Sequence, residues 1–374
     1  MRPVTKIEKI TADILDIPTI RGHVLAMTTM TQQSFVLVRI QFSDGSCGIG
    51  EGTSIGGLSY GCESPESIAS AITTYIAPML QGQAANNVNA LITRMEKVVK
   101  GNFIARSAVE MALWDGLARR LDLSISALFG GAQHASIQVA WTLASGDSAR
   151  DIEEAEEMLA TRRHRIFKLK IGNRSVEDDL AHVGAIAKAV AGRASIRVDV
   201  NQAWSLQQAR WGAAGLQDLG VDLIEQPLAA HDRAGMAELV ASHKIAIMAD
   251  EALNGPKDAL AMAQARAADV YAVKVAQSGG LAAAREVCAM AEAAGLGLYG
   301  GTMLECGVGS AAGLQLFATR KQMQWGCELF GPLLFKDEIL ATPLVYRDFD
   351  VHLPAGPGIG VELDADKTKY YRRG

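Results

Sequence analysis

The sequence lacks several features that would tie it to particular classes of protein. Positive charge is not in excess, because 36 Lys and Arg residues stand against 41 Asp and Glu residues, for a formal net charge of −5. Without a basic field, binding to a nucleic-acid backbone or to an anionic membrane surface is disfavoured. No uninterrupted apolar run approaches about 18 residues, and the first residues show no apolar core of a signal peptide. We therefore expect a cytoplasmic protein that acts on small molecules and binds neither nucleic acid nor membrane.

Cysteine and histidine are scarce and scattered. The five cysteines have no C-x-x-C spacing, and their odd number does not suggest a disulfide framework. We expect them to be small buried side chains. The seven histidines form no H-E-x-x-H or H-x-H pattern, so metal binding through histidine is disfavoured.

The N-terminal part of the chain has the pattern of an antiparallel sheet followed by helices. Alternating apolar runs flank Asp44-Gly45, which is a strong hairpin signal. After Ser64-Pro65 the apolar spacing becomes helical and predicts helices over 66–80, 88–99 and 105–121. The motif GIGEG at 48–52 follows the hairpin rather than opening a helix, so we interpret its glycines as turn residues and not as a dinucleotide-binding loop. These features predict an α+β domain over residues 1–130.

From residue 131 onward, short β-branched runs alternate with alanine-rich helical stretches. The runs are RIFKLKIG, SIRVDVNQ, VDLIEQP, IAIMADE, VYAVKVA and LGLYGGTM. Ionisable residues recur in the first five at steps of 29, 26, 25 and 24 residues: Lys170, Asp199, Glu225, Asp250 and Lys274. A period of this size is one βα unit. The pattern predicts a parallel sheet covered by helices, either closed as a barrel or open and doubly wound.

The distribution of these ionisable residues favours the barrel. An open sheet binds ligands at its switch point with groups from a few strands. Here nearly every strand contributes an ionisable group near its carboxyl end, and only a closed ring brings all of those ends together. We predict a barrel domain over residues 131–331. The segment 332–374 lacks the βα rhythm, and we expect it to return to the N-terminal domain.

Two lysines in RIFKLKIG are candidates for proton-transfer chemistry. Lys168 and Lys170 alternate with Phe167 and Leu169, so both lysines lie on one face of a strand. Two unit charges about 7 Å apart repel by roughly 2.4 kcal/mol at an effective dielectric of about 20. Such repulsion, together with burial, can lower a lysine pKa enough for it to act as a base near neutral pH. For these eight residues alone, an edge strand with two solvated lysines explains the pattern equally well.

Three carboxylates end consecutive predicted strands: Asp199, Glu225 and Asp250. In a barrel they would converge and repel, and a hard divalent cation with oxygen ligands resolves the repulsion. A single Asp at a strand end commonly caps a helix, but three at this regular period favour a metal site. Glu251 points away from Asp250 on a regular strand, so we assign it a supporting role. Lys274 lies across the ring, and a cation between opposing amines is suited to forming an enolate and moving a proton at the adjacent carbon.

The motifs KLK, DVN, EQP, ADE and KVAQSGG, in this order, resemble those of the enolase superfamily in its muconate lactonizing subgroup. The resemblance extends over nearly the whole chain, and the longer stretches AWTLASGD, GLYGGTMLE, CELFGPLLF and IGGLSYGCESPE are similar to bacterial muconate cycloisomerases. It implies a (β/α)7β modified TIM barrel with an α+β capping domain formed from the N-terminal region and the C-terminal tail. It also implies a homo-oligomer, namely an octamer.

The resemblance implies one divalent cation, Mn2+ or Mg2+, held by Asp199, Glu225 and Asp250. The substrate would be a small dicarboxylate, cis,cis-muconate. One of its carboxylates would bind the cation, while the other adds to a double bond and leaves an enolate that becomes muconolactone on protonation.

For the remaining site residues the resemblance implies separate roles. Lys170 would act as the general acid and base at the α-carbon, and Lys168 and Lys274 would stabilise the enolate. Asn201 and Glu328 would face the site and complete the catalytic set. Two long glycine-containing stretches of the N-terminal domain, residues 18–30 and 52–61, are expected to be connections that act as lids and exclude water. The candidate substrate contacts are Ile55, Tyr60 and Phe330.

Several alternatives stay open at this point. Chloromuconate cycloisomerases resemble the chain throughout, and Ala272 resembles the unsubstituted branch, because the enzymes for chlorinated substrates tend to carry serine there. N-acylamino acid racemases, succinylbenzoate synthases and dipeptide epimerases share the mechanism, although the Asp-x-Asp expected of the last is absent near the eighth strand. A lysine nucleophile forming a Schiff base and a binding protein without turnover are the candidates from other classes.

Overall fold

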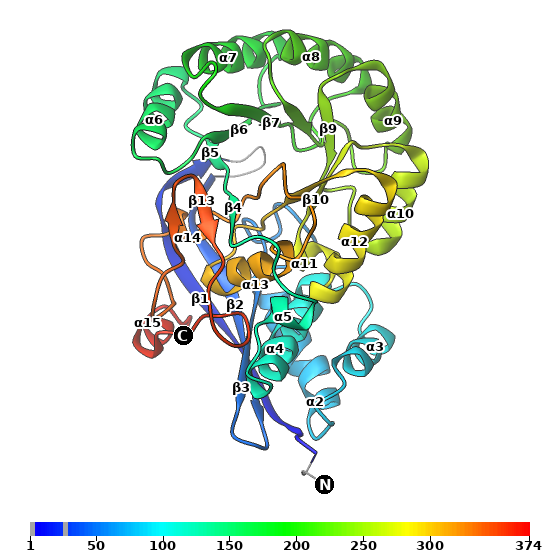
Figure 1. The fold of residues 1–374 in the computed structure, drawn as a ribbon, viewed down its shortest axis with the longest axis vertical. Coiled ribbons are helices and arrows are strands. Elements are labelled where there is room, and N and C mark those ends of the chain that lie inside the picture. Colours follow the sequence, from blue (N-terminus) through cyan, green and yellow to red (C-terminus); the bar gives the residue numbers. More distant parts are fainter. Residues whose placement is uncertain (1–3, 25–28) are drawn as a thin grey trace.

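The computed structural model describes residues 4–24 and 29–374. Figure 1 shows an arc of helices around a curled parallel sheet, with a long antiparallel sheet and a second group of helices at the other end. The C-terminal end lies beside the antiparallel sheet. This arrangement leaves one rim of the curled sheet facing the antiparallel sheet.

The N-terminal sheet has three antiparallel strands in the order β1-β2-β3. Its strands are β1 (Ile7–Val24), β2 (Thr29–Phe42) and β3 (Cys47–Thr53). The predicted hairpin is confirmed, because Asp44-Gly45 joins β2 to β3 and Gly45 has a φ of 83°. The glycine is needed there because this left-handed conformation is strained for other residues.

The helices predicted next to this sheet are present, one of them in pieces. They are α1 (Pro65–Ala71), the π-helical turn η1 (Ile72–Ile76), α2 (Ala77–Leu80), α3 (Val88–Val98), α4 (Phe103–Arg120) and α5 (Ile125–Leu128). The first begins at Ser64, whose side chain accepts from the Ser67 amide, and Pro65 occupies the first turn, where no amide hydrogen is required. The predicted helix over 66–80 is therefore one helical stretch with a π-helical turn in its middle.

The glycines of GIGEG lie within β3, so their interpretation as turn residues was wrong. Gly48 and Gly50 face α4, and a Cβ atom would lie 2.1 Å from the Ala112 carbonyl oxygen at the first and 2.1 Å from the Ala108 carbonyl oxygen at the second. Sheet and helix therefore pack backbone against backbone, which only glycine permits. The exclusion of a dinucleotide-binding loop stands, since these residues do not open a helix.

We expect Gly50→Ala to destabilise the protein by about 1–3 kcal/mol, because the added methyl group must push β3 away from α4. Urea unfolding of the two proteins measures the loss. Gly22→Ala is the matched control, since its Cβ would meet only the Thr29 Cγ2 atom at an ordinary 3.5 Å. Equal unfolding midpoints for Gly50→Ala and the wild type would contradict the packing argument.

The curled sheet consists of seven parallel strands in the order β11-β10-β9-β8-β7-β6-β5. The strands are β5 (Trp141–Leu143), β6 (Ile166–Lys170), β7 (Ser195–Asp199), β8 (Leu223–Glu225), β9 (Ala246–Ala249), β10 (Val270–Val273) and β11 (Gly297–Gly300). Cys327 closes the ring, because it forms parallel bridges both to Gly300 at one edge and to Val139 at the other. The choice of a barrel over an open sheet is thereby confirmed.

Helices alternate with these strands and cover the outside of the barrel (Figure 1). They are α6 (Ser148–Ala160), α7 (Val176–Ala189), α8 (Leu206–Asp218), α9 (Arg233–Ser242), α10 (Pro256–Ala265), α11 (Val275–Ser278), α12 (Leu281–Ala294) and α13 (Gly307–Phe317). Several begin at a capping side chain: Asp147, Ser175, Ser205 and Asp232. Among the helices in the described part of the chain, none is both long and apolar enough to cross a membrane.

A separate buried apolar cluster lies inside the ring, formed by Ala140, Ile166, Leu223, Met248, Val270, Ala272 and Tyr299. One charged side chain, Arg197, is buried against it and lies over the Tyr299 ring. Outward-facing strand residues join the larger core beneath the helices. Since side chains alternate along each strand, this packing leaves the inward-facing positions at the carboxyl ends for polar residues.

The C-terminal segment contacts both parts of the molecule. It contains α14 (Gly331–Leu334), β12 (Tyr346–Arg347), β13 (Asp350–His352) and α15 (Ala365–Tyr370). Strand β13 pairs with β4 (Ser136–Gln138), next to the barrel. Arg373 binds the Asp16 carboxylate of β1 at 2.7 Å, and the Asp16 amide donates to the Tyr371 carbonyl at 2.9 Å. The segment therefore lies against the N-terminal sheet and also pairs with a strand beside the barrel.

The cysteines depart from expectation. Cys288, Cys306 and Cys327 are buried, but Cys47 and Cys62 are exposed, so the expectation of burial was wrong for two of the five. All five have free thiols, in agreement with the absence of a disulfide pattern in the sequence.

Candidate active site

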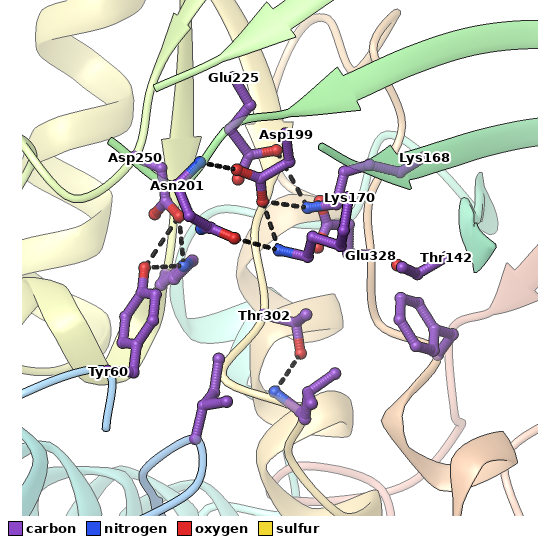
Figure 2. A pocket seen from close by; sticks show the side chains of 14 residues that line it. Tyr60, Thr142, Lys168, Lys170, Asp199, Asn201, Glu225, Asp250, Thr302 and Glu328 are labelled. Atoms are coloured by element: carbon purple, nitrogen blue, oxygen red, sulfur yellow. Dashed lines mark hydrogen bonds and ion pairs between the residues drawn. The ribbon is translucent and has the colours of Figure 1, made fainter. Parts of the chain in front are cut away.

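A cavity lies at the carboxyl ends of the barrel strands, between the barrel and the N-terminal part of the chain. Figure 2 shows the side chains that line it. The sequence predicted eleven of them: Ile55, Tyr60, Lys168, Lys170, Asp199, Asn201, Glu225, Asp250, Lys274, Glu328 and Phe330. The structure therefore brings together every residue that the sequence proposed for the site, whichever role each one has.

Strand register explains why these side chains meet. Lys170, Asp199 and Glu225 occupy paired positions on the adjacent strands β6, β7 and β8. Asp250 follows the last residue of β9, and Lys274 follows the last residue of β10. Parallel strands present their carboxyl ends at the same rim, so five consecutive strands deliver five charged groups to one place.

Lys170 is the lysine most open to the cavity. Its side chain is 16% exposed, whereas that of Lys168 is 3% exposed. Its Nζ atom donates to the Asp199 carboxylate and, at 3.0 Å, to the Asn201 Oδ1 atom (Figure 2). A bound molecule can therefore approach this amine directly.

Lys168 is enclosed by carboxylates. Its Nζ atom lies 3.0 Å from a Glu225 oxygen and 3.5 Å from an Asp199 oxygen, and it also donates to Glu328. Burial opposes the charge on Lys168, but Glu225, Glu328 and Asp199 outweigh it and raise the lysine pKa well above its ordinary value. The argument that repulsion between the two lysines lowers a lysine pKa was therefore wrong for Lys168. This amine is suited to holding positive charge and not to acting as a base.

Lys274 stands on the opposite side of the cavity with Tyr60. Its Nζ atom donates to Asp250 at 2.7 Å and to the Tyr60 hydroxyl at 2.6 Å, and that hydroxyl donates to Asp250 at 2.8 Å. Burial works against the charged form of Lys274, yet Asp250 and the more distant Glu225 raise its pKa. Tyr60 comes from the segment after β3, so the N-terminal part of the chain closes this side of the site.

The three carboxylates fit a divalent cation by their chemistry. Asp199, Glu225 and Asp250 are each 1% exposed and offer hard oxygen donors. Burial raises the pKa of Glu225 well above its ordinary value, and the negative charge of Asp199 raises it further. The Asp250 Oδ1 atom is buried without a hydrogen-bond partner among the described residues. The site thus contains negative charge that the lysines leave incompletely compensated.

The carboxylates do not stand in ligand geometry in this structure. Within residues 4–24 and 29–374, no three acidic, histidine or cysteine side chains converge as a ready cation site. The physical reason is that lysines bind the same oxygens, with Lys168 and Lys170 on Asp199 and Lys274 on Asp250. A cation held by these carboxylates would replace some of those ion pairs.

Glu251 has a supporting position beside the cavity. Its Oε1 atom accepts from the Asn201 Nδ2 atom at 3.0 Å, and Asn201 in turn accepts from Lys170. Asn201 has a φ of 45°, in the left-handed region that asparagine tolerates better than most residues. Burial, followed by repulsion from Asp250, raises the pKa of Glu251 to about 7.

Three lining residues were not predicted from the sequence: Thr142, Thr302 and Leu304. The periodic search followed ionisable residues, and none of these three is ionisable. Thr142 lies on β5, and the other two lie in the connection between β11 and α13. All three lie within or just after predicted barrel strands. This position could have identified them as lining residues, because the carboxyl ends of all barrel strands lie on the same rim.

Two family descriptions match the chain. Residues 9–130 match "Mandelate racemase / muconate lactonizing enzyme, N-terminal domain", and residues 150–367 match "Enolase C-terminal domain-like". The chain belongs to the mandelate racemase and muconate lactonizing enzyme family, within the enolase superfamily. The resemblance drawn from the short motifs is therefore confirmed.

Relatives with assigned names align with this chain over nearly its full length. The chain is 55% identical to Muconate cycloisomerase 1-2 of Acinetobacter lwoffii over 368 residues, which are 98% of this chain and 96% of that protein. It is 45% identical to the chloromuconate cycloisomerase of Pseudomonas sp. strain P51, over 98% of this chain and 99% of that protein.

A solved structure confirms the predicted fold class. The muconate lactonizing enzyme from Pseudomonas fluorescens, complexed with muconolactone, matches with a TM-score of 0.98 and 51% sequence identity. The match covers 99% of this chain and 100% of that one. The fold of this chain is therefore a (β/α)7β barrel with an α+β capping domain. The three strands β1, β2 and β3 of the capping domain are called the capping sheet.

Proposed function

We propose that the protein is a muconate cycloisomerase, an isomerase that interconverts cis,cis-muconate and muconolactone. The observation that carries this proposal is the cavity itself, in which opposing lysines and three carboxylates lie on a fold that matches a muconolactone-bound enzyme at a TM-score of 0.98. With a divalent cation on the carboxylates, the cavity and its three amines would present positive charge that suits a small dianionic substrate.

The proposed reaction assigns the proton transfer to Lys170. An oxygen of one substrate carboxylate forms a bond to the β-carbon of the other carboxylate, and the electron pair of the double bond between that β-carbon and the α-carbon moves toward the second carboxylate as an enolate. Lys170 then delivers a proton from Nζ to the α-carbon, which gives muconolactone. In the reverse direction the neutral amine removes the same proton.

The other charged residues would stabilise the enolate. Lys168 and Lys274, whose pKa values are raised by neighbouring carboxylates, keep their charge beside the enolate. A divalent cation held by Asp199, Glu225 and Asp250 would supply further compensation for the charge that develops. Asn201 and Glu328 would orient Lys170 and Lys168, to which they are hydrogen-bonded.

Ile55, Tyr60 and Phe330 are the proposed substrate contacts. Ile55 is 7% exposed and Phe330 is 1% exposed, and both line the cavity. Apolar walls exclude water from the enolate, which strengthens every electrostatic contact made to it. Of the two connections expected as lids, residues 52–61 contribute Ile55 and Tyr60 to the cavity wall. The expectation of a connection over 18–30 was wrong for its described part, because residues 18–24 belong to β1 and residues 29–30 to β2, while residues 25–28 lie outside the described residues.

Family membership implies dependence on a divalent cation. We propose Mn2+ or Mg2+ as that cation, a homo-octamer as the assembly, and the cytoplasm as the location. We also propose the domain limits drawn from the sequence, with the capping domain at 1–130, the barrel at 131–331 and the returning segment at 332–374.

The test is a spectrophotometric assay of the purified protein with cis,cis-muconate and Mn2+. We expect loss of substrate absorbance, and its absence would contradict the proposed substrate. Parallel assays with 2- and 3-chloromuconate address the alternative suggested by the relatives that are 45% identical. We expect kcat/KM to be highest for unsubstituted muconate, and a higher value for a chlorinated substrate would favour a chloromuconate cycloisomerase instead.

A further inference from the structure

Leu304 lies on the cavity wall with a backbone conformation that side-chain-bearing residues rarely adopt. Its φ angle is 59°, in the left-handed region, and its side chain lines the cavity and is 3% exposed. Such a conformation is unfavourable for leucine and persists only where surrounding contacts enforce it. The contacts around Leu304 should therefore include groups that hold its backbone.

Gln33 of β2 is one such group. Its side chain is 1% exposed, and its Nε2 atom donates to the carbonyl oxygens of Met303 at 3.2 Å and Leu304 at 3.4 Å. Within the same connection, the Leu304 amide donates to the Thr302 hydroxyl at 2.8 Å. That hydroxyl donates to the buried Glu305 carboxylate. Both backbone polar groups of Leu304 are thus held.

Glu51 of β3 holds the other end of this connection. Its carboxylate accepts from the Cys306 amide and the Gly309 amide, each at 2.8 Å, and from the Thr53 hydroxyl at 2.6 Å. The two amides belong to the start of α13, where a carboxylate is electrostatically favoured. Glu51 therefore ties the strand that leads to Ile55 to the connection that carries Leu304.

We propose that Gln33 and Glu51 are positioning residues and that Leu304 is a specificity-determining residue. This inference rests on the proposed cycloisomerase activity. The capping sheet holds residues 302–306 so that Leu304 faces the carbon chain of the substrate. A chlorine substituent on that chain needs room that the Leu304 side chain occupies. By fixing Leu304 in this position, the hydrogen bonds of Gln33 and Glu51 therefore favour the unsubstituted dicarboxylate over a chlorinated one.

Gln33→Leu removes the hydrogen bonds from Gln33 to the Met303 and Leu304 carbonyl oxygens, and Gln32→Leu is its matched control. Gln32 is the preceding residue on β2 and is exposed, so both variants make the same chemical change on opposite faces. For Gln33→Leu we expect KM for cis,cis-muconate to rise and kcat/KM to fall about tenfold, as for the loss of a buried hydrogen bond. We also expect the preference for muconate over 2-chloromuconate, as a ratio of kcat/KM values, to fall at least about threefold. Gln32→Leu should leave both quantities unchanged.

Thermal unfolding tests the backbone strain without any substrate. Leu304→Ala and Leu304→Gly both remove the side chain, but only glycine accepts a φ of 59° freely. We expect Leu304→Gly to have the higher Tm by about 2 °C, the reverse of the usual order. In a Gln33→Leu background the difference should vanish, because the connection can relax.

The outcomes separate this inference from the proposed function. If the wild type does not convert cis,cis-muconate, the proposed function fails, and the thermal comparison still reports whether Gln33 enforces the conformation of Leu304. If the wild type is active but Gln33→Leu behaves like Gln32→Leu, the positioning role is overturned alone. A Tm for Leu304→Ala equal to or above that of Leu304→Gly would likewise overturn it.

Discussion

Replacing Lys170 by alanine will lower kcat for cis,cis-muconate by about 10²–10⁴-fold, the usual contribution of a positioned general acid or base. The amine is the lysine most open to the cavity, with a side chain 16% exposed against 3% for Lys168 and 4% for Lys274. The other two amines are held elsewhere, because Lys168 is enclosed by carboxylates and Lys274 donates to Asp250 and Tyr60. Steady-state kinetics with saturating substrate measures the loss. The KM should change little, since Lys170 is required for proton delivery more than for binding.

Two further variants sharpen this prediction. Lys188→Ala removes an exposed lysine from α7 and should leave kcat unchanged. Lys168→Ala should lower kcat and also raise KM, because it removes a charge beside the substrate and leaves Glu225 and Glu328 without their partner. In D2O, exchange of the α-proton of muconolactone, followed by NMR, should stop in Lys170→Ala. Continued exchange at the wild-type rate would show that another group moves the proton.

Removing divalent cations with EDTA will lower turnover on the order of 10³-fold, because the cation contributes several kcal/mol of charge stabilisation. Adding Mn2+ or Mg2+ should restore the activity. The buried carboxylates also predict a rise in Tm when the cation is added to the metal-free protein, since a ligand that binds only the folded state stabilises it. Calorimetric or fluorescence-monitored unfolding gives this shift independently of catalysis.

Asp250→Asn tests whether Asp250 is a ligand of the cation or contributes only general negative charge to the site. The variant keeps the shape of the side chain but loses one negative charge, so the cation concentration required for half-maximal activity should rise at least about tenfold. Asp218→Asn, at the exposed end of α8, is the control and should behave as the wild type. Full activity in EDTA would contradict the metal assignment and favour the Schiff-base alternative, which trapping with borohydride would then reveal.

Much of the site followed from local rules. Strand alternation put Lys168 and Lys170 on one face, and the period of one βα unit identified Asp199, Glu225, Asp250 and Lys274 as equivalent positions. These inferences succeeded because pleating and the length of a βα unit are properties of the chain that hold in any parallel barrel. The family motifs at the same positions then added the chemistry.

Other features depended on contacts between distant segments, which no local pattern contains. GIGEG was assigned to a turn because the approach of β3 to the α4 backbone is set by packing. The pKa of Lys168 was misjudged because its nearest charges are Glu225 and Glu328, from distant segments of the chain, and not Lys170. The pairing of Cys327 with both sheet edges, which closes the barrel, involves a single residue with no strand pattern around it.

The sequence by itself determined the fold class and the identity of the charged residues, since periodicity and motif order depend only on the chain. The tertiary structure alone decided how those charges pair, that Thr142, Thr302 and Leu304 also line the cavity, and how the capping sheet reaches the barrel. Gln33 shows the difference most clearly, because it is an ordinary polar residue in an alternating strand until folding places it 3.2 Å from the Met303 carbonyl oxygen. Pairing and lining depend on distances between segments far apart in the chain, and those distances exist only after folding.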